Sequence, residues 1–340
     1  MTKTYGVVLI GCGHIGEDHI SQIYYRENIR IVAVVDEDAE RAQLFARKYG
    51  AAMWETDYRS CITRDDVDIV IIATYVNTHL DILRDCLAAG KHVLCEKPIA
   101  ANLADGEEFC RLAMQAKTHV LVAHILRYNE SYRRIRALIQ SGVIGDVKVI
   151  RMTQNHHALN WPRYKRLLAD CSPVLDCGVH YYDIIQWFTG ARITRVQGIG
   201  TVIDNDLAAD QVNYGLVSMQ LSNGAIAYYE AGWSQNCSSS NVKEFIGDKG
   251  RITLTMKNFR CTHVEEGDCI EVYHNDTDCY ETMNVQANYK NMWEQLKALI
   301  DLIEGRETDA PTIEDIHSAF LVGMAADAAI RNNTAVTVGR

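Results

Sequence analysis

The first 36 residues combine two apolar segments with a glycine-rich turn, and no other feature constrains the fold as much. Residues 5–10 form an apolar run that predicts a strand, and the turn Gly11-Cys12-Gly13-His14-Ile15-Gly16 follows it directly. A helical segment and a second apolar run, residues 29–35, come next and end at Asp36. Glycines at these spacings permit the tight turn, the approach of a pyrophosphate and close helix packing. The helix N-terminus, at His14 and Ile15, offers N–H groups to phosphates. The pattern therefore predicts a dinucleotide-binding unit.

Asp36 indicates which dinucleotide is bound. It lies twenty residues after Gly16, where a carboxylate can accept hydrogen bonds from a ribose diol. A carboxylate there would repel a 2′-phosphate, and Glu37 and Asp38 follow it, with no cation before Arg41. The sequence therefore favours NAD(H) over NADP(H). The alternative interpretation is a solvated acidic turn that begins the next helix.

The composition is that of an ordinary globular protein with room for two domains. The 340 residues are 48% hydrophobic and 23% charged, and the formal net charge is −10. This acidic balance argues against nucleic-acid binding, and no apolar stretch approaches the length of a membrane span. The first strand begins near residue 5 with no signal peptide before it, so we expect a cytoplasmic protein. Eleven scattered cysteines without a C-x-x-C pair predict reduced thiols.

The hydrophobic pattern changes near residue 126, and this change predicts two domains. Across residues 1–126, apolar runs alternate with helical stripes, as in a doubly wound parallel sheet of the Rossmann type. Residues 127–340 instead predict an α+β domain on a large open, mainly antiparallel sheet. Its hairpins are predicted across 212–233, 242–256 and 260–274. Two helices, near 289–303 and 313–331, end the chain, and the last is a candidate to pack back on the first domain.

One candidate catalytic segment follows a predicted strand at residues 91–95. Lys97, in Glu96-Lys97-Pro98, would lie beyond the carboxyl end of this strand, the edge at which doubly wound sheets bind ligands. An amine held rigidly there can polarise an oxygen and share in proton transfer. Taken alone, a loop lysine is more often simply solvated.

A second candidate segment is Asp176-Cys177-Gly178-Val179-His180-Tyr181-Tyr182-Asp183. If it begins a helix, Asp176, His180 and Asp183 lie on one face. Histidine can take a proton near neutral pH, and a carboxylate beside it can orient the ring and stabilise the imidazolium. The alternative is a helix capped by Asp176, with His180 as a core residue.

In combination, these motifs resemble the glucose–fructose oxidoreductase and inositol dehydrogenase family over nearly the whole chain. The resemblance implies NAD as the cofactor, bound by Gly11, Gly13, His14, Ile15, Gly16, Asp36, Thr74, Asn77, His79, Glu96 and Lys97. It implies catalytic roles for Lys97, Asp176 and His180, and it allows a cis Lys97–Pro98 peptide. Tyr75 departs from the family, which often has proline there. Family members commonly pair their open sheets, which implies a homodimer or homotetramer.

The resemblance also implies the reaction, a hydride transfer between nicotinamide and a secondary alcohol of a sugar, glycoside or cyclitol such as inositol. His180, oriented by Asp176, would take the hydroxyl proton, and Lys97 would stabilise the charge on the same oxygen. Substrate contacts are expected from Lys97, Arg127, Tyr128, Asn155, His156, Trp161, Tyr164, Asp176 and His180. Aromatic residues of the irregular stretch 161–165 can equally be packing residues.

Three rival functions stay open. A zinc site would draw on His156, His157, Cys171, Cys177 and His180, but their spacing matches no ligand pattern, so we expect no metal. A tightly bound, recycled NAD would serve a net non-redox or coupled reaction. A non-catalytic NAD(H)-binding regulatory subunit is the third possibility, and the complete set of Lys97, Asp176 and His180 argues against it.

Overall fold

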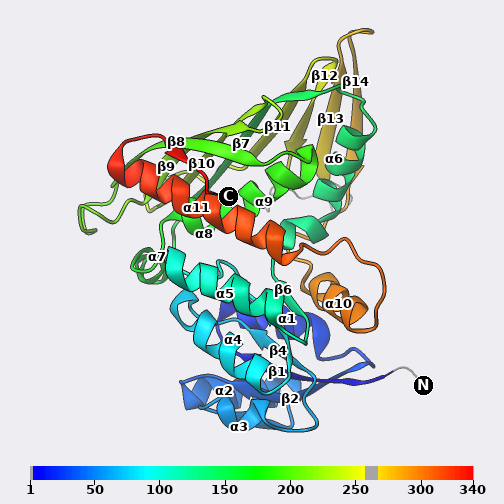
Figure 1. Ribbon diagram of the computed structural model, residues 1–340, viewed down its shortest axis with the longest axis vertical. Helices are drawn as coiled ribbons and strands as arrows, with labels where there is room; N and C mark the ends of the chain where they lie inside the picture. The colour runs from blue at the N-terminus through cyan, green and yellow to red at the C-terminus, as the bar shows by residue number, and fades with distance from the viewer. Residues whose placement is uncertain (1–2, 257–266, 340) are drawn as a thin grey trace. The chain divides into compact units, whose positions relative to one another are not determined.

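The computed structural model describes residues 3–256 and 267–339 (Figure 1). It divides into two compact units, the first with residues 1–125 and 290–317 and the second with residues 126–289 and 318–340. The division at residue 125 falls beside the predicted boundary. The contiguous domains 1–126 and 127–340 differ from this division because the chain returns to the first unit at Lys290.

The first unit contains a six-stranded sheet in the order β3-β2-β1-β4-β5-β6, with every pairing parallel. Its strands are β1 Tyr5–Ile10, β2 Ile29–Val35, β3 Met53–Glu55, β4 Ile69–Ile72, β5 His92–Cys95 and β6 Val120–Val122. The helices are α1 His14–Ile23, α2 Ala39–Tyr49, α3 Arg59–Ile62, α4 His79–Ala88, α5 Leu103–Gln115 and α10 Met292–Ile303. Strand order reverses between β1 and β4, which is the switch point where such sheets bind ligands. The predicted doubly wound fold is confirmed.

Local sequence accounts for several helix ends in this unit. Asp38 caps α2 by accepting from the N–H groups of Glu40 and Arg41, and Gly50 ends it with φ of 66°. Asn102 caps α5, as its sequence position predicts. Asn77, of a residue type that often caps helices, lies in a short 3₁₀ turn, η1 Val76–Thr78, and α4 begins without a side-chain cap.

The returning segment joins the first unit through α1. The Gln22 side chain donates to the Lys290 carbonyl at 2.9 Å and accepts from the Met292 N–H at 3.0 Å. Lys290 also forms an ion pair with Asp18 at 2.6 Å. These contacts make α10 part of the nucleotide-binding unit, although residues 126–289 of the second unit lie between it and β6 in sequence.

The second unit contains a nine-stranded sheet in the order β14-β13-β12-β11-β7-β10-β9-β8-β15. Its strands are β7 Val147–His157, β8 Ile193–Thr201, β9 Tyr214–Leu221, β10 Ile226–Ser234, β11 Val242–Gly247, β12 Gly250–Thr255, β13 Asp268–His274, β14 Cys279–Val285 and β15 Val336–Thr337. The pair β7–β10 is parallel, and the other recorded pairings are antiparallel. A large, mainly antiparallel sheet is therefore confirmed.

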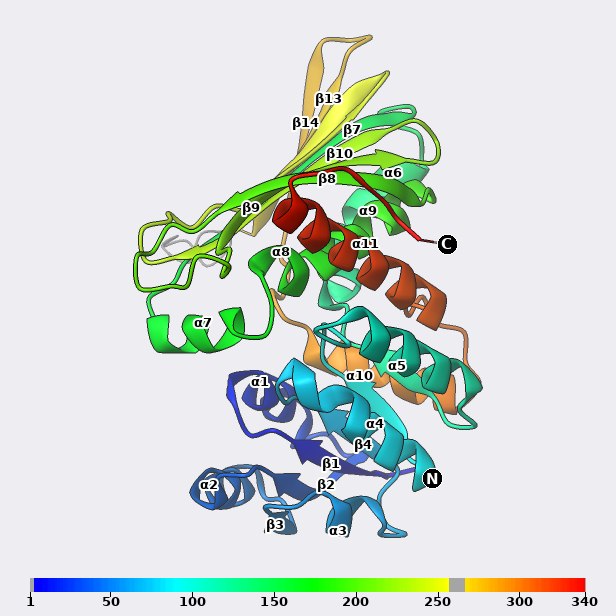
Figure 2. The same ribbon diagram turned by 60° about the vertical axis from the view of Figure 1, so that its left-hand side comes forward.

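Helices pack on one face of this sheet, which we call the inner face. They include α6 Glu130–Gln140, α8 Pro173–Asp176, α9 Gly178–Thr189 and the later part of α11 Ile313–Asn332. Ile330 of α11 lies against Gly198 and Gly200 of β8, where an added Cβ would come within 2.7 Å of its side chain. The opposite face, which we call the outer face, carries no helix among the described residues (Figure 2).

The structure corrects two details of the predicted second domain and leaves one predicted hairpin untested. The hairpins β9–β10 and β11–β12 are confirmed, but the segment 260–264, predicted to pair with 269–274, lies outside the described residues. Among the described residues, β13 pairs with β12 and with β14, a mostly polar strand that hydrophobic alternation did not reveal. The stretch expected to be irregular contains a helix, α7 Trp161–Leu168, capped by Asn160.

Candidate active site

The glycine-rich turn forms a cradle that only small residues permit. Gly11 has φ of +97°, and an added Cβ at Gly16 would lie 1.9 Å from the Gly11 carbonyl oxygen. A Cβ at Gly13 would meet nothing within 4 Å, so the space over this residue is open. Gly13 is also the N-cap of α1 and makes no side-chain cap. The first N–H groups of α1 are thus available to an anion, and the residues present fit a pyrophosphate.

These two glycines lead to a prediction with opposite outcomes. Gly16→Ala forces a Cβ into backbone, so we expect a stability loss of about 1–3 kcal/mol. Gly13→Ala is sterically free and has an ordinary φ of −84°. It should therefore fold normally but weaken NAD binding about tenfold or more, because its methyl group takes space that the pyrophosphate needs. Thermal unfolding and NAD titration separate the two, and normal NAD affinity in Gly13→Ala would contradict this interpretation.

Asp36 ties the end of β2 to the glycine-rich turn. Its carboxylate accepts from the Cys12 N–H at 2.8 Å and from the Asp38 N–H at 3.0 Å, and the residue is 8% exposed. Arg41 approaches the same carboxylate at 3.4 Å. The alternative of an acidic helix start applies to Asp38, which caps α2, whereas Asp36 faces the turn. This placement suits a ribose acceptor beside the pyrophosphate cradle.

The loop after β4 contains the other residues expected near nicotinamide. Thr74 is half-buried and its hydroxyl lies 2.7 Å from that of Thr78, while Asn77 is exposed. His79 is 1% exposed, and its ring nitrogens lie 3.0 Å from the Pro98 carbonyl and 3.2 Å from the Thr74 carbonyl. Burial lowers the pKa of His79. Its ring therefore contacts protein backbone on both sides.

Lys97 lies directly beyond the end of β5, half-buried, and its peptide bond to Pro98 is cis, as the resemblance allowed. The Glu96 carboxylate turns away from solvent toward α1, where it lies 2.7 Å from Nε2 of His19. Burial raises the pKa of Glu96, but the His19 hydrogen bond and the nearby charges of His19, Lys97 and Lys290 outweigh it, so the pKa is lowered. Glu96 is thus an ionised, half-buried acceptor.

His19 is a functional candidate that the sequence analysis missed. It is fully buried on the stripe of α1 formed with Gly16, Ile20 and Ile23. A polar residue at an apolar helix position was the available signal, since a buried imidazole needs a partner. The sequence did not show that the partner would be Glu96, because 77 residues separate them.

In the second unit, the segment with Asp176 and His180 is helical, but it begins earlier than expected. Ser172 caps α8 by accepting from the Leu175 N–H, and the Asp176 N–H donates to the Ser172 carbonyl at 2.9 Å. Cys177, between α8 and α9, has helical φ and ψ of −80° and −35°. Asp176 is therefore inside helical structure, and the interpretation of Asp176 as the helix cap is wrong.

Asp176 and His180 are both half-buried and stand four residues apart along this helical path. Positions at this spacing are neighbours on one helix face. The structure thus supports a carboxylate beside an imidazole.

Arg127 and Asp183 form a buried ion pair, with N–O distances of 2.6 and 2.8 Å. Their side chains are 5% and 1% exposed. The two-pronged geometry fixes the Arg127 guanidinium against Asp183, which lies on α9 about one turn after His180. Arg127 was expected to contact substrate, but its guanidinium fork binds Asp183. Tyr128, expected beside it, is 2% exposed. Arg127 therefore supports α9 from within the unit, and Tyr128 is buried.

Strand alternation separates Asn155 from His156. Asn155 points to the outer face, where its amide donates to Glu230, which also accepts from the Tyr214 hydroxyl at 2.5 Å. His156 points to the inner face, with Nδ1 3.0 Å from the Tyr164 hydroxyl. Successive side chains of a strand face opposite sides, so the two residues present their polar groups to different faces of the sheet.

Helix α7 holds Trp161 and Tyr164, whose surroundings differ. Trp161 is 7% exposed, packs with Ala158, Leu168, Cys177 and Trp233, and donates its indole N–H to Asp206 at 2.8 Å. It is thus a packing residue. Burial raises the pKa of Tyr164, and the charges of Cys177 and Asp176 add to this effect. Tyr164 therefore lies within electrostatic range of Asp176.

The rival metal site finds no support in the described part of the chain. Within residues 3–256 and 267–339, no three His, Cys, Asp or Glu side chains are grouped to hold a metal ion. The ten cysteines described are free, and burial raises the pKa of the Cys12, Cys86 and Cys110 thiols to about 12. A separate finding is that no described helix has both the length and the apolar character needed to cross a membrane.

Comparison with known proteins gives matches along the whole chain. It is 26% identical to a myo-inositol 2-dehydrogenase of Thermotoga maritima, over 96% of this chain and 97% of that protein. It is also 26% identical to a 2,7-anhydro-N-acetylneuraminate hydratase of Mediterraneibacter gnavus, over 99% and 95%. A scyllo-inositol dehydrogenase from Lactobacillus casei, solved with NAD(H) and scyllo-inositol, shares the fold at a TM-score of 0.79 and 23% identity, over 99% of both chains.

Two family models cover most of the chain. The model "Oxidoreductase family, NAD-binding Rossmann fold" matches residues 5–124, and the "GFO/IDH/MocA C-terminal domain" matches residues 132–253. The first match spans the glycine cradle, Asp36 and Lys97, and the second spans Asp176 and His180. With the cradle described above, they establish NAD as the cofactor. The chain belongs to the GFO/IDH/MocA family of NAD-binding oxidoreductases.

Proposed function

We propose that this protein oxidises a secondary alcohol of a sugar, glycoside or cyclitol with NAD⁺, and catalyses the reverse reduction. The observation that carries the proposal is the complete set of Lys97 beyond β5 and Asp176 with His180 on the α8–α9 path. A protein that only binds NAD has no need of this set. Inositol dehydrogenases among the relatives make a cyclitol the first substrate to test.

The residues have distinct roles in the proposed reaction. His180 accepts the proton of the reacting hydroxyl, and Asp176 orients the imidazole and stabilises its positive charge. The ammonium group of Lys97 donates a hydrogen bond to the same oxygen and stabilises the negative charge that develops there. NAD⁺, held by the glycine cradle and Asp36, supplies the hydride acceptor. Further substrate contacts are proposed for His156 and Tyr164, whose linked polar groups suit a ligand with several hydroxyls.

The direct test is a screen for NAD⁺ reduction with purified protein. Inositol isomers, monosaccharides and glycosides are supplied one at a time, and NADH absorbance is followed. We expect turnover with at least one polyhydroxylated ring, and analysis of the product would identify the oxidised carbon. Absence of NAD⁺ reduction with all three classes, by a protein that binds NAD, would overturn the proposal.

A second candidate is a net non-redox reaction with a retained, recycled NAD. The relative named as a hydratase supports it, because the sequence similarity to that protein extends over nearly the whole of both chains. Release of free NADH distinguishes the candidates. A dehydrogenase releases one NADH for each substrate oxidised, whereas a recycling enzyme converts substrate with no accumulation of free NADH.

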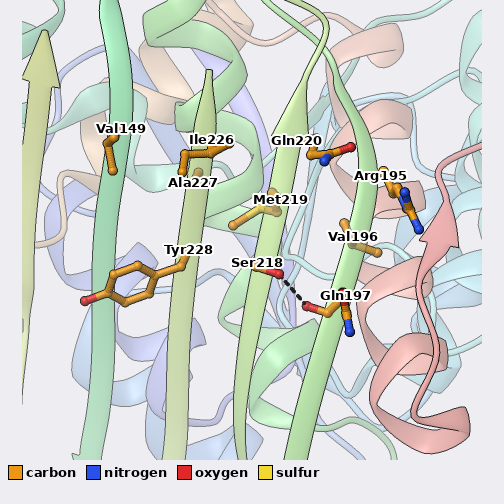
Figure 3. A pocket seen from close by; sticks show the side chains of 10 residues that line it. All are labelled: Val149, Arg195, Val196, Gln197, Ser218, Met219, Gln220, Ile226, Ala227 and Tyr228. Carbon is orange, nitrogen blue, oxygen red and sulfur yellow. Dashed lines mark hydrogen bonds between the residues drawn. The ribbon is translucent and has the colours of Figure 1, made fainter. Parts of the chain in front are cut away.

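We also propose that the outer face of the second unit's sheet joins copies of this chain. Four large apolar side chains on it, Ile199, Leu216, Ile226 and Val242, are between 37% and 61% exposed. A hollow of about 440 Å³ lies on the same face, lined by residues of β7, β8, β9 and β10 (Figure 3). Exposed apolar surface of this extent is typical of interaction sites.

Charge placed on this face should therefore weaken association. The double variant Ile199→Asp, Ile226→Glu alters two exposed side chains, and we expect a smaller mass in light scattering with unfolding temperature nearly unchanged. The matched control is Leu44→Asp on α2, which is 57% exposed and lies in the first unit. An unaltered mass in the double variant, or a monomeric wild-type protein, would contradict the proposed interface.

A further inference from the structure

The Glu96-Lys97-Pro98 segment is held by two buried histidines from different helices, one at the Glu96 side chain and one at the Pro98 backbone. His19 of α1 contacts the Glu96 carboxylate at 2.7 Å, and His79 of α4 lies 3.0 Å from the Pro98 carbonyl. His19 is 0% exposed and His79 is 1% exposed. Both rings are therefore shielded from bulk solvent. Lys97 is thus flanked on both sides by fixed contacts.

The contact through Glu96 reaches Lys97 directly. One carboxylate oxygen lies against His19, and the other accepts from the backbone N–H of Lys97 at 3.3 Å. The nearby cations keep Glu96 ionised, and an ionised carboxylate can only accept hydrogen bonds. Nε2 of His19 must therefore be the donor. Helix α1, Glu96 and the Lys97 backbone form one connected chain of hydrogen bonds.

This chain of hydrogen bonds ties the position of Lys97 to that of helix α1. The N-terminus of α1 is the pyrophosphate cradle, so the same helix fixes the cofactor and, through His19, the segment that carries the catalytic ammonium group. Catalytic groups lose much of their effect when misplaced by about 1 Å. A buried donor aimed at the carboxylate prevents such movement of Lys97.

We propose that His19 is a positioning residue that fixes Lys97 through Glu96. The inference rests on the proposed function, because it assumes that Lys97 acts in the reaction. In this proposal His19 contacts Glu96 and is not assigned a contact with substrate or cofactor. His19 affects turnover by fixing the position of Lys97, and NAD binding does not depend on His19.

The test compares two substitutions that differ only in the donor. His19→Phe keeps a ring of similar size but removes the N–H, whereas His19→Gln places an amide N–H near the former Nε2 position. Turnover is measured with NAD⁺ and myo-inositol, or with whichever alcohol reacts faster in the screen above. The control is His119→Phe, an exposed histidine at the opposite end of the same sheet.

We expect kcat to fall about 10- to 100-fold in His19→Phe, by analogy with the loss of outer-shell partners in other sites. The NAD dissociation constant should stay within about twofold, and His19→Gln should recover most of the lost kcat. A purely structural histidine would lower the unfolding temperature without this recovery. Wild-type kcat in His19→Phe, an equal loss in His119→Phe, a failure of His19→Gln to restore turnover, or a loss confined to NAD affinity would each overturn the inference.

Two further variants keep the test decisive. If His19→Phe does not fold, Glu96→Gln removes the charge from the same hydrogen-bond chain at nearly equal size, and the same loss of kcat at unchanged NAD affinity is expected. Lys97→Met tests the catalytic role of Lys97 separately from the positioning role of His19. If Lys97→Met abolishes turnover but His19→Phe leaves turnover unchanged, only the positioning role of His19 fails. When Lys97→Met retains wild-type turnover, the proposed function and the inference both fail.

Discussion

Replacing Lys97 by methionine is expected to lower kcat by about two to three orders of magnitude. Methionine nearly matches the lysine side chain in length but cannot donate a hydrogen bond or carry charge. Loss of one preorganised donor to a developing oxyanion typically reduces kcat by about 10²- to 10³-fold. Steady-state kinetics with the best alcohol of the screen gives kcat, and a direct titration gives the NAD dissociation constant.

NAD affinity should change little in Lys97→Met, because the glycine cradle and Asp36 lie on other segments. The matched control is Lys117→Met, an exposed lysine beyond α5 in the same unit. We expect wild-type kinetics from it. If Lys97→Met kept wild-type kcat, Lys97 would not be catalytic, and the first part of the proposed mechanism would have to be withdrawn.

Replacing His180 by glutamine is expected to lower kcat by about 10²- to 10⁴-fold, which is the usual contribution of a general base. Glutamine retains a polar, hydrogen-bonding side chain but cannot take a proton near neutral pH. The position is half-buried near the start of α9, and glutamine has good helix propensity, so the fold should be retained. Single-turnover measurements at saturating NAD⁺ report the loss directly.

Asp176→Asn completes this prediction. It keeps the size of the side chain but removes the charge that stabilises the imidazolium, so we expect a smaller loss than in His180→Gln. Because the two residues act as one unit, the double variant should be nearly as active as His180→Gln alone. Additive losses would show that Asp176 acts separately from His180. The control His274→Gln, on β13 of the same unit, should retain wild-type turnover.

The nucleotide-binding half could be predicted from the sequence because its determinants are local. Gly11, Gly13 and Gly16 act through backbone conformation and contacts within a few residues, so their spacing carries the information. The apolar runs of the parallel strands and the caps Asp38 and Asn102 are likewise properties of short segments. The alternation of strands and helices then restricts the topology to a doubly wound sheet.

The supports of the candidate site could not be predicted in the same way. His19 finds its partner across 77 residues, and Arg127 finds Asp183 across 56. Asn155 and His156 are adjacent in sequence but face opposite sides of β7, because strand alternation separates them. The internal partners of Arg127, Asn155 and Trp161 could therefore not be predicted from the polarity of these residues alone.

The sequence by itself determined the family, the NAD cradle and the residue types able to do the chemistry, since each depends on local spacing that any reader of the chain can measure. Only the tertiary structure decided which polar side chains are committed to internal partners. That decision depends on which distant segments meet when the apolar faces are buried, and burial leaves a polar group with whatever partner the packing provides. His19 beside Glu96, and the return of the chain at Lys290 to helix α1, are outcomes of this kind.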